Sequence, residues 1–223
     1  MDYRENKNEP DTVIRQQPAY MMNESDESDE MIRSIYEEDY SRSGNLTIAD
    51  LEATPEDRRV ELINGVFYDM AEPLLVHQRI AGTIYRQIGN YIENNNGKCM
   101  PYISPVGVKP HADDDRTIVE PDVIVVCNPD KQQHPRYIIG GPDLVVEVLS
   151  PSTKKRDLVV KKKIYQSAGV REYWIVDPEA RYVFVYRFEK DNVTFVHTFD
   201  DAIPVWIYDG QLEIRLDGVM ETD

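Results

Sequence analysis

Two stretches in the middle of the chain are apolar on both faces and predict central strands. Residues 123–127 read Val-Ile-Val-Val-Cys, and residues 144–149 read Leu-Val-Val-Glu-Val-Leu. Short runs of this kind, rich in β-branched residues, are typical of strands that are covered on both sides of a sheet. Asp122 stands at the head of the first run, and Glu147 lies inside the second. A buried carboxylate needs a cation or a hydrogen-bond donor, or it takes up a proton. Both residues are therefore candidates for a functional site.

A helical pattern follows the second run and offers such a cation. Apolar residues recur at helical spacing from 157 to 168, and Gly169 provides a C-terminal stop. At about 100° per residue, Lys161 falls near the middle of the apolar arc, Lys162 at its edge and Lys163 outside it. The pattern predicts that only Lys161 points inward. The alternative is a lysine that snorkels past the edge of the core, and the two unexplained carboxylates favour the paired interpretation.

The rest of the pattern predicts a mixed α/β fold, with a central mixed sheet flanked by at least two helices. Asn64-Gly65 supplies a turn with positive φ between two short strands in residues 61–70. A stripe of isoleucines marks a long helix at 74–94, and His77 on the same face is either a satisfied core residue or part of the site. The other expected elements are a short helix capped by Thr47, strands at 100–109, 117–127 and 172–177, a hairpin at 182–198, and short strands at 202–208 and 211–215.

Charge divides the chain into a tail and a domain. Residues 1–45 hold twelve acidic and five basic residues, a net −7, which leaves −9 of the total −16 for the remainder. We expect 1–45 to be a disordered or loosely held acidic tail, 46–216 to be one domain and 217–223 to be a short C-terminal tail. The tail either has no role, screens basic residues or docks a protein partner.

Several separate motifs, in order between residues 46 and 216, resemble the Uma2 (DUF820) family of restriction-endonuclease-like proteins. They are Glu-Leu-Ile-Asn-Gly at 61–65, Pro-Asp-Val at 121–123, Leu-Val-Val-Glu-Val-Leu-Ser-Pro-Ser-Thr at 144–153, Asp157 with Lys161 and Tyr165, and Ala-Gly-Val-Arg-Glu-Tyr-Trp-Ile-Val-Asp at 168–177. The resemblance implies a restriction-endonuclease-like fold of the PD-(D/E)xK nuclease superfamily. In that superfamily an Asp and a Glu bind a divalent metal, and a Lys assists the attacking water.

The resemblance implies a set of site residues in this chain. Asp122, Glu147 and the backbone carbonyl of Val148 would hold Mg²⁺, with Mn²⁺ as a substitute, because these small hard ions take oxygen ligands. The residue two positions after Glu147 is a leucine, so the family's lysine corresponds to Lys161 on the following helix. Burial would lower the pKa of this lysine, which would orient or deprotonate the water or offset developing charge. Glu61 is either an accessory carboxylate of the site or a structural residue.

Basic residues near this site predict contacts with nucleic acid. Six of the ten residues in 154–163 are Lys or Arg. The residues expected to grip phosphates are Lys154, Lys155, Arg156, Lys162 and Tyr165. Two alternatives remain, namely that the lysines form a solvated helix face and that Tyr165 belongs to the core. The acidic net charge also disfavours non-specific binding to nucleic acid.

The predicted function is a metal-dependent endonuclease that hydrolyses phosphodiester bonds, with DNA as the expected partner and a homodimer as the form suited to cutting both strands. A non-catalytic nucleic-acid-binding or regulatory module that retains the nuclease fold is the alternative, and a protein-interaction unit built around the tail is a third. No apolar run approaches the roughly eighteen residues of a membrane span and the N-terminus has no signal-peptide pattern, so we expect no membrane partner and a cytoplasmic location. Cys99 and Cys127 are expected to be a reduced pair without zinc.

Overall fold

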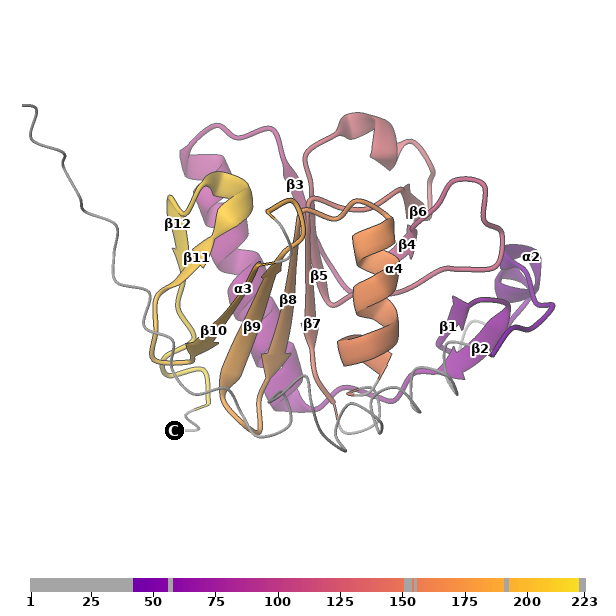
Figure 1. Cartoon of the computed structure of the whole chain (residues 1–223), viewed down its shortest axis with the longest axis horizontal. Coiled ribbons are helices and arrows are strands. Elements are labelled where there is room, and N and C mark those ends of the chain that lie inside the picture. Colours follow the sequence, from indigo (N-terminus) through magenta and orange to yellow (C-terminus); the bar gives the residue numbers. More distant parts are fainter. Residues whose placement is uncertain (1–41, 56–57, 151–153, 155, 191–192, 221–223) are drawn as a thin grey trace, which may run out of the picture.

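A six-stranded mixed sheet forms the centre of the protein (Figure 1). The structure is a computed structural model and describes residues 42–55, 58–150, 154, 156–190 and 193–220. The strands run in the order β10-β9-β8-β7-β5-β3. Their bounds are β3 Met100–Ile103, β5 Val123–Val126, β7 Leu144–Val148, β8 Glu172–Asp177, β9 Tyr182–Arg187 and β10 Val193–Thr198. The two apolar runs of the sequence are thus β5 and β7, and they lie side by side within the sheet, as the pattern predicted.

Strand β7 pairs in parallel with β8 and antiparallel with β5. All five of its residues are buried, and their side chains alternate between the two faces of the sheet. Val146 packs into the core cluster on the face that helix α3 (Leu75–Asn94) covers, whereas Val145 packs into the cluster on the opposite face. Glu147 therefore points into the same layer as Val145, on the face of the sheet opposite α3.

Helices cover the two faces of the sheet, as expected (Figure 1). Helix α3, Leu75–Asn94, lies across one face and buries its isoleucine stripe there. On the other face a π-helix, η3 Arg156–Lys161, continues directly into α4, Lys162–Ser167. Gly169 follows with a φ of +76°, which is the left-handed conformation expected at the end of a helix. The predicted helix is confirmed, but its first half is wound more widely than an α-helix.

Smaller elements lie on either side of the central sheet, beyond α4 and beside α3 (Figure 1). The predicted hairpin is β1 Val60–Ile63 and β2 Val66–Asp69, and Asn64 and Gly65 have φ of 50° and 75° at its turn. A bridge between Leu62 and Ile118 ties β1 to the segment leading into β5. The remaining elements are α2 Ile48–Glu52, β4 Gly107–Lys109 paired with β6 Tyr137–Ile139, β11 Ile203–Val205 paired with β12 Leu212–Ile214, and the 3₁₀ turns η2 Pro129–Gln132 and η4 Trp206–Tyr208.

The two cysteines form a disulfide, so the prediction of a reduced pair is wrong. Cys99 precedes β3 and Cys127 follows β5. Met100 pairs with Val126 in the antiparallel ladder of these strands, so the two cysteines occupy the next position of the same register. The separation of 28 residues in the sequence concealed this proximity. Because the cysteines are bonded, they no longer support the inference of a reducing compartment.

The predicted acidic tail falls almost entirely on residues 1–41, which lie outside the described residues, as do 221–223 at the other end. Within the described part of the chain, no helix has the length and apolar character needed to span a bilayer.

Candidate active site

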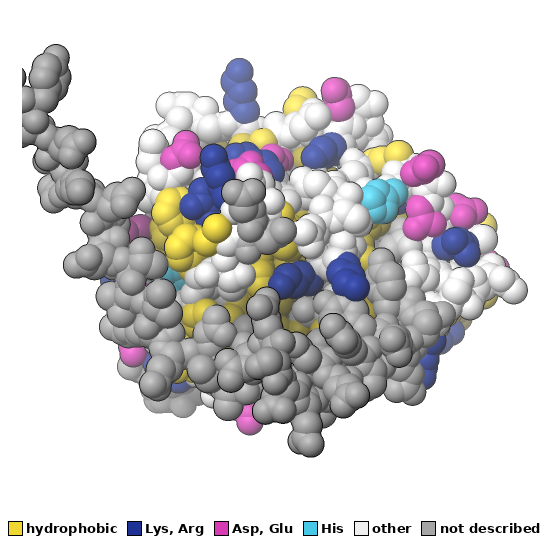
Figure 2. Space-filling view, viewed as in Figure 1, with side chains coloured by type: hydrophobic (Ala, Val, Ile, Leu, Met, Phe, Trp, Pro, Cys, Tyr) yellow, Lys and Arg dark blue, Asp and Glu magenta, His cyan; other side chains and the backbone are white. Residues whose placement is uncertain are grey.

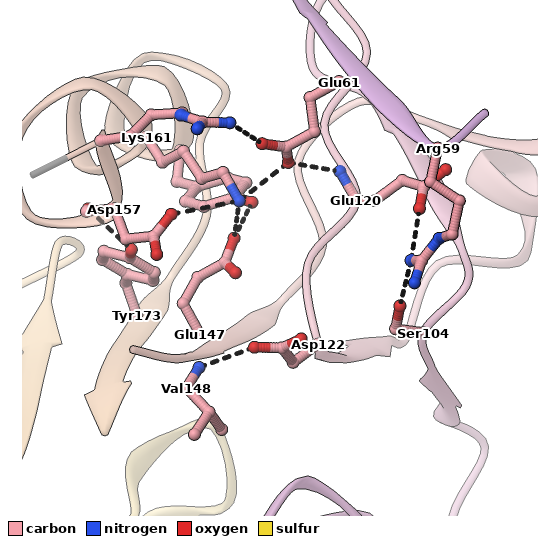
Figure 3. Close-up of polar contacts among 12 residues, drawn as sticks. Arg59, Glu61, Ser104, Glu120, Asp122, Glu147, Val148, Asp157, Lys161 and Tyr173 are labelled. Atoms are coloured by element: carbon pink, nitrogen blue, oxygen red, sulfur yellow. Dashed lines mark hydrogen bonds and ion pairs between the residues drawn. The ribbon is translucent and has the colours of Figure 1, made fainter. Parts of the chain in front are cut away.

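The sheet register brings Asp122 and Glu147 together. Val123 pairs with Val146 in the antiparallel ladder of β5 and β7, so the next position of that register sets Asp122 opposite Glu147. Side chains directly opposite in an antiparallel pair share one face of the sheet. Both residues also line the same pocket, together with Val148 and Lys161. Four of the residues proposed from the sequence thus converge at one end of the two central strands (Figure 3).

Lys161 is buried among three carboxylates (Figure 3). Its Nζ lies 2.8 Å from Glu61 Oε1, 3.0 Å from Glu147 Oε1 and 3.3 Å from Asp157 Oδ1. The residue is 2% exposed, whereas Lys163 is exposed. The helical periodicity therefore gave the correct orientation for Lys161, and the snorkelling alternative does not hold.

Asp157 is a member of this cluster to which the sequence reasoning assigned no role. It lies in the first turn of η3, is 2% exposed, and reaches Lys161 four residues further along the chain. Its backbone carbonyl accepts a hydrogen bond of 2.9 Å from the hydroxyl of Tyr173 on β8. The i,i+4 spacing of Asp157 and Lys161 was visible in the sequence and could have identified the pair.

Glu61 joins β1 to the cluster through three contacts. Its Oε1 accepts a hydrogen bond of 2.9 Å from the backbone N–H of Glu120 as well as the contact from Lys161. Its Oε2 lies 3.2 Å from a guanidinium nitrogen of Arg156. Glu61 is 1% exposed, so its carboxylate connects the hairpin, the segment before Asp122 and the π-helix.

Two donors converge on one oxygen of Asp122. The backbone N–H of Val148 donates to Asp122 Oδ2 over 2.7 Å, and Nε2 of His77 lies 3.2 Å from the same atom. The sequence left open whether His77 belongs to the core or to the site. The structure places it on the wall of the pocket, in contact with Asp122.

Tyr165 is fully buried, and its hydroxyl donates a hydrogen bond of 2.6 Å to Glu147 Oε1. Its ring packs 5.1 Å from that of Tyr173, centroid to centroid. The sequence-based expectation that Tyr165 contacts a nucleic-acid phosphate does not fit this position. Its partner is a carboxylate inside the site.

The pKa values of Lys161 and of Glu147 are both raised, for different reasons. Burial lowers the pKa of Lys161, but the charges of Asp157, Glu147 and Glu61 outweigh this effect, so that its pKa is raised well above the ordinary value. The expected net depression of this pKa is therefore wrong, because three carboxylates surround the ammonium and together outweigh the effect of burial. Burial also raises the pKa of Glu147 well above its ordinary value, and Lys161 opposes that shift. Lys161 is thus the fixed cation of the site.

The basic residues expected to bind nucleic acid are mostly engaged within the protein. Nζ of Lys154 lies 2.9 Å from Asp177 Oδ2. The guanidinium of Arg156 lies 4.7 Å from the ring centroid of Tyr68 in addition to its contact with Glu61. Nζ of Lys162 lies 4.0 Å above the ring of Tyr186, and burial lowers its pKa. Lys155 lies outside the described residues.

The surface around α4 agrees with these contacts. Figure 2 shows basic side chains interspersed with acidic and uncharged ones on this face, with no continuous basic area among the residues drawn in colour. At the mouth of the pocket a guanidinium nitrogen of Arg59 lies 2.9 Å from Glu120 Oε2 and 3.3 Å from Ser104 Oγ. The sequence analysis did not single out Arg59, since nothing in its local pattern indicates that it reaches the pocket.

The chemistry of the carboxylates fits a small hard cation, although the described residues include no group of three or more His, Cys, Asp or Glu side chains arranged to hold a metal ion. Asp122 Oδ1 and Glu147 Oε2 receive no hydrogen bond from the described residues, because every donor goes to the other oxygen of each group. In the register of β5 and β7, the residue opposite Val148 is Pro121, which has no N–H to offer to the Val148 carbonyl. Two carboxylate oxygens and a carbonyl suit Mg²⁺, which keeps several of its waters when bound.

The six-stranded mixed sheet with helices on both faces is a mixed α/β fold, and the comparisons with known proteins agree. The chain is similar to the crystal structure of a putative nuclease belonging to DUF820 from Anabaena variabilis ATCC 29413, with a TM-score of 0.64 and 20% identity over 78% of this chain and 97% of that one. Residues 47–206 match the model of the Uma2 family, which is described as putative restriction endonuclease, and the chain belongs to this family. No curated protein matches the chain.

Proposed function

We propose that this protein is a metal-dependent endonuclease that hydrolyses phosphodiester bonds of DNA. The observation that carries the proposal is the position of Lys161. A buried ammonium lies 3.0 Å from Glu147, and the sheet register sets that carboxylate opposite Asp122. This combination of one fixed cation and two carboxylates, each with an oxygen that receives no donor from the described residues, suits a reaction in which negative charge develops beside a divalent ion.

Asp122, Glu147 and the carbonyl of Val148 would hold Mg²⁺, with Mn²⁺ as a substitute. Bound between these ligands, a divalent ion would supply Lewis-acid polarisation of the phosphoryl group and would lower the pKa of a water. The chain's own part is to present oxygen ligands in a fixed geometry. Val148 would contribute twice: its N–H donates to Asp122, and its carbonyl, which interacts with the ring of His77, has no backbone N–H opposite it in the register of the sheet.

Lys161 would act as a cation rather than as a base. Its raised pKa keeps the ammonium protonated at neutral pH, so that it can orient the attacking water and offset charge on the phosphate. Glu61 and Asp157 hold it in place with contacts of 2.8 and 3.3 Å. Tyr165 supports Glu147 from the buried side through its hydroxyl. Glu61 is therefore an accessory carboxylate in this proposal.

DNA binding would depend on few surface charges. Arg59 at the mouth of the pocket is partly exposed, as is Lys154, whereas Arg156 is held almost entirely inside. An acidic protein whose basic residues are mostly paired should bind DNA weakly, and with a shallow salt dependence because few phosphates are neutralised, which suits a substrate that is released after cleavage. The acidic residues 1–45 remain a candidate for docking a protein partner, and a homodimer would serve double-strand cleavage.

Nicking of supercoiled plasmid DNA in Mg²⁺ tests the proposal. We expect the wild-type protein to nick the plasmid and Asp122→Asn to lose at least about a hundredfold in rate, since removal of a group that stabilises charge in a transition state typically costs this much. Glu213→Gln is the matched control, because Glu213 is an exposed carboxylate on β12. Plasmid binding without nicking by the wild-type protein would instead favour the non-catalytic nucleic-acid-binding module.

A further inference from the structure

His77 is the residue of the pocket whose position the proposed chemistry leaves unused. It lies in the first turn of α3, and the ring reaches across the end of the sheet to Asp122. The side chains of His77 and Asp122 are 12% and 13% exposed, so the contact between them is largely shielded from water. A contact between elements 45 residues apart in sequence is not a consequence of local structure.

In the contact between His77 and Asp122, the imidazole is the donor and the carboxylate is the acceptor. An ionised carboxylate only accepts hydrogen bonds, so Nε2 of His77 must carry the proton that Asp122 receives. Nδ1 of His77 is buried and has no hydrogen-bond partner among the described residues. The imidazole therefore directs Nε2 at Asp122, and the ring also interacts with the backbone of Val148 at the end of β7.

Both donors to Asp122 select the same oxygen. The N–H of Val148 reaches Oδ2 over 2.7 Å and Nε2 of His77 reaches it over 3.2 Å, while Oδ1 receives no donor from the described residues. The terminal torsion of an aspartate is broad and has no sharp intrinsic preference. Two donors on one oxygen restrict that torsion and leave the second oxygen directed at the pocket.

The helix that carries His77 is well suited to fix the ring. Ile80 and Ala81, three and four residues further along α3, are buried in the core against the sheet. The first turn is closed by a hydrogen bond of 3.1 Å from the N–H of Gln78 to the carbonyl of Leu74. The position of Nε2 is thereby set by the packing of α3 and not by the loop before Asp122.

We propose that His77 is a positioning residue for the metal ligand Asp122, which it holds by an Nε2–H···Oδ2 hydrogen bond so that Oδ1 is presented to a divalent cation. This inference rests on the proposed function, because it gives Asp122 a metal to bind. It assigns His77 a role through Asp122 and no contact with substrate. Outer hydrogen-bonding partners of metal ligands typically contribute about 10- to 100-fold to metal affinity.

Substitutions at position 77 can distinguish the effect of the hydrogen-bond donor from the effect of the volume that the side chain fills. His77→Gln can place an amide N–H near the position of Nε2, whereas His77→Asn carries the same amide too close to the backbone to reach Asp122. His77→Leu fills the space without a donor. Far-ultraviolet circular dichroism and the melting temperature of each variant report whether it folds, and the Gln and Asn variants form the decisive pair if the Leu variant is unstable.

Mn²⁺ affinity, measured without DNA by electron paramagnetic resonance of the free ion, is the readout. We expect His77→Asn and His77→Leu to bind Mn²⁺ about 10- to 100-fold more weakly than the wild type, and His77→Gln to remain within about threefold of it. Equal affinity in all four proteins would overturn the role of His77 and leave the proposed function standing. The same holds if His77→Gln is as weak as His77→Asn in folded protein. A wild-type protein that binds no Mn²⁺ would refute the proposed function, and the role of His77 with it.

Discussion

Nζ of Lys161 lies 3.0 Å from Oε1 of Glu147, although one residue comes from a helix and the other from the central strand of the sheet. The ammonium is almost fully buried and touches two further carboxylates, those of Glu61 and Asp157. A buried charge of this kind is tolerated only when it is paired. The surrounding acids therefore explain both why Lys161 can be buried and why it keeps its proton.

Replacing Lys161 should abolish cleavage, whereas replacing Lys163 should not. Lys161→Ala removes the cation beside Glu147, so we expect no detectable plasmid nicking. Lys163 is exposed on the same helix, so Lys163→Ala should only weaken DNA binding, and the loss should vary with salt. Nicking rates at several salt concentrations check both expectations. Equal effects of the two substitutions would contradict the distinction between the inward and outward lysines.

Glu61→Gln should show whether Glu61 positions Lys161 or binds the metal ion. Glu61 contacts Lys161, Arg156 and the N–H of Glu120 but is not among the proposed metal ligands. The neutral amide weakens the hold on Lys161 and presents an N–H₂ group to one of its cationic neighbours. We expect the nicking rate to fall about tenfold or more, since hydrogen bonds to charged groups contribute about 1.5–3 kcal/mol. Mn²⁺ affinity should stay within about threefold of the wild type, and a large loss of affinity would make Glu61 a metal ligand instead.

Tyr165→Phe should lower stability through Glu147. The substitution removes a buried donor that lies 2.6 Å from Glu147 Oε1 and leaves the ring in place. We expect the free energy of unfolding to fall by about 1.5–3 kcal/mol, the usual contribution of a hydrogen bond to a charged group. Urea denaturation measures the change, and Tyr182→Phe on β9 serves as a control of the same chemistry at a partly exposed site. If both variants lose the same amount, the hydroxyl of Tyr165 has no special role in supporting Glu147.

Glu172 should make stability depend on pH. Burial raises the pKa of its carboxyl group to about 7 from an ordinary value of 4.5, although N–H donors of Trp174 and Ile207 oppose the shift. Between these two values the folded state binds more protons than the unfolded state, so the free energy of unfolding falls as pH rises from about 5 to 7. The contribution is fully present below the lower value and is lost above the upper one.

Glu172→Gln tests this prediction, because an amide does not titrate. The slope of unfolding free energy against pH in this window should shrink by up to one proton, or about 1.4 kcal/mol per pH unit. Urea denaturation of both proteins at pH 5, 6, 7 and 8 gives the comparison. Identical slopes would mean that the ionised carboxylate is well enough solvated by its donors to titrate normally in the fold.

The sequence predicted the parts of the site that follow from local periodicity. Both faces of β5 and β7 are apolar, which marked Asp122 and Glu147 as unusual, and helical spacing turned Lys161 inward. The hairpin was equally clear, because Asn64-Gly65 requires positive φ at both positions. In each of these cases, the residues that determine the structure lie within a single strand, helix or turn.

The parts that escaped prediction depend on contacts between distant segments. The disulfide joins Cys99 and Cys127 only because β3 pairs with β5 in a particular register. The pKa of Lys161 rises instead of falling because Glu61, exactly one hundred residues earlier, reaches the same ammonium as Asp157 and Glu147. The contact of His77 with Asp122 likewise depends on how α3 crosses the end of the sheet, which no local pattern encodes.

The most direct test of the account is a titration of Mg²⁺ and Mn²⁺ into the wild type and Glu147→Gln, with plasmid nicking followed in the same samples. Gln at this position can still accept the contacts from Lys161 and Tyr165 through its carbonyl, but it lacks the second carboxylate oxygen. We predict that the wild type binds metal and nicks the plasmid, and that both properties are lost in the variant. Metal-dependent nicking by Glu147→Gln at the wild-type rate would contradict the central claim that Glu147 and Asp122 form the catalytic metal site.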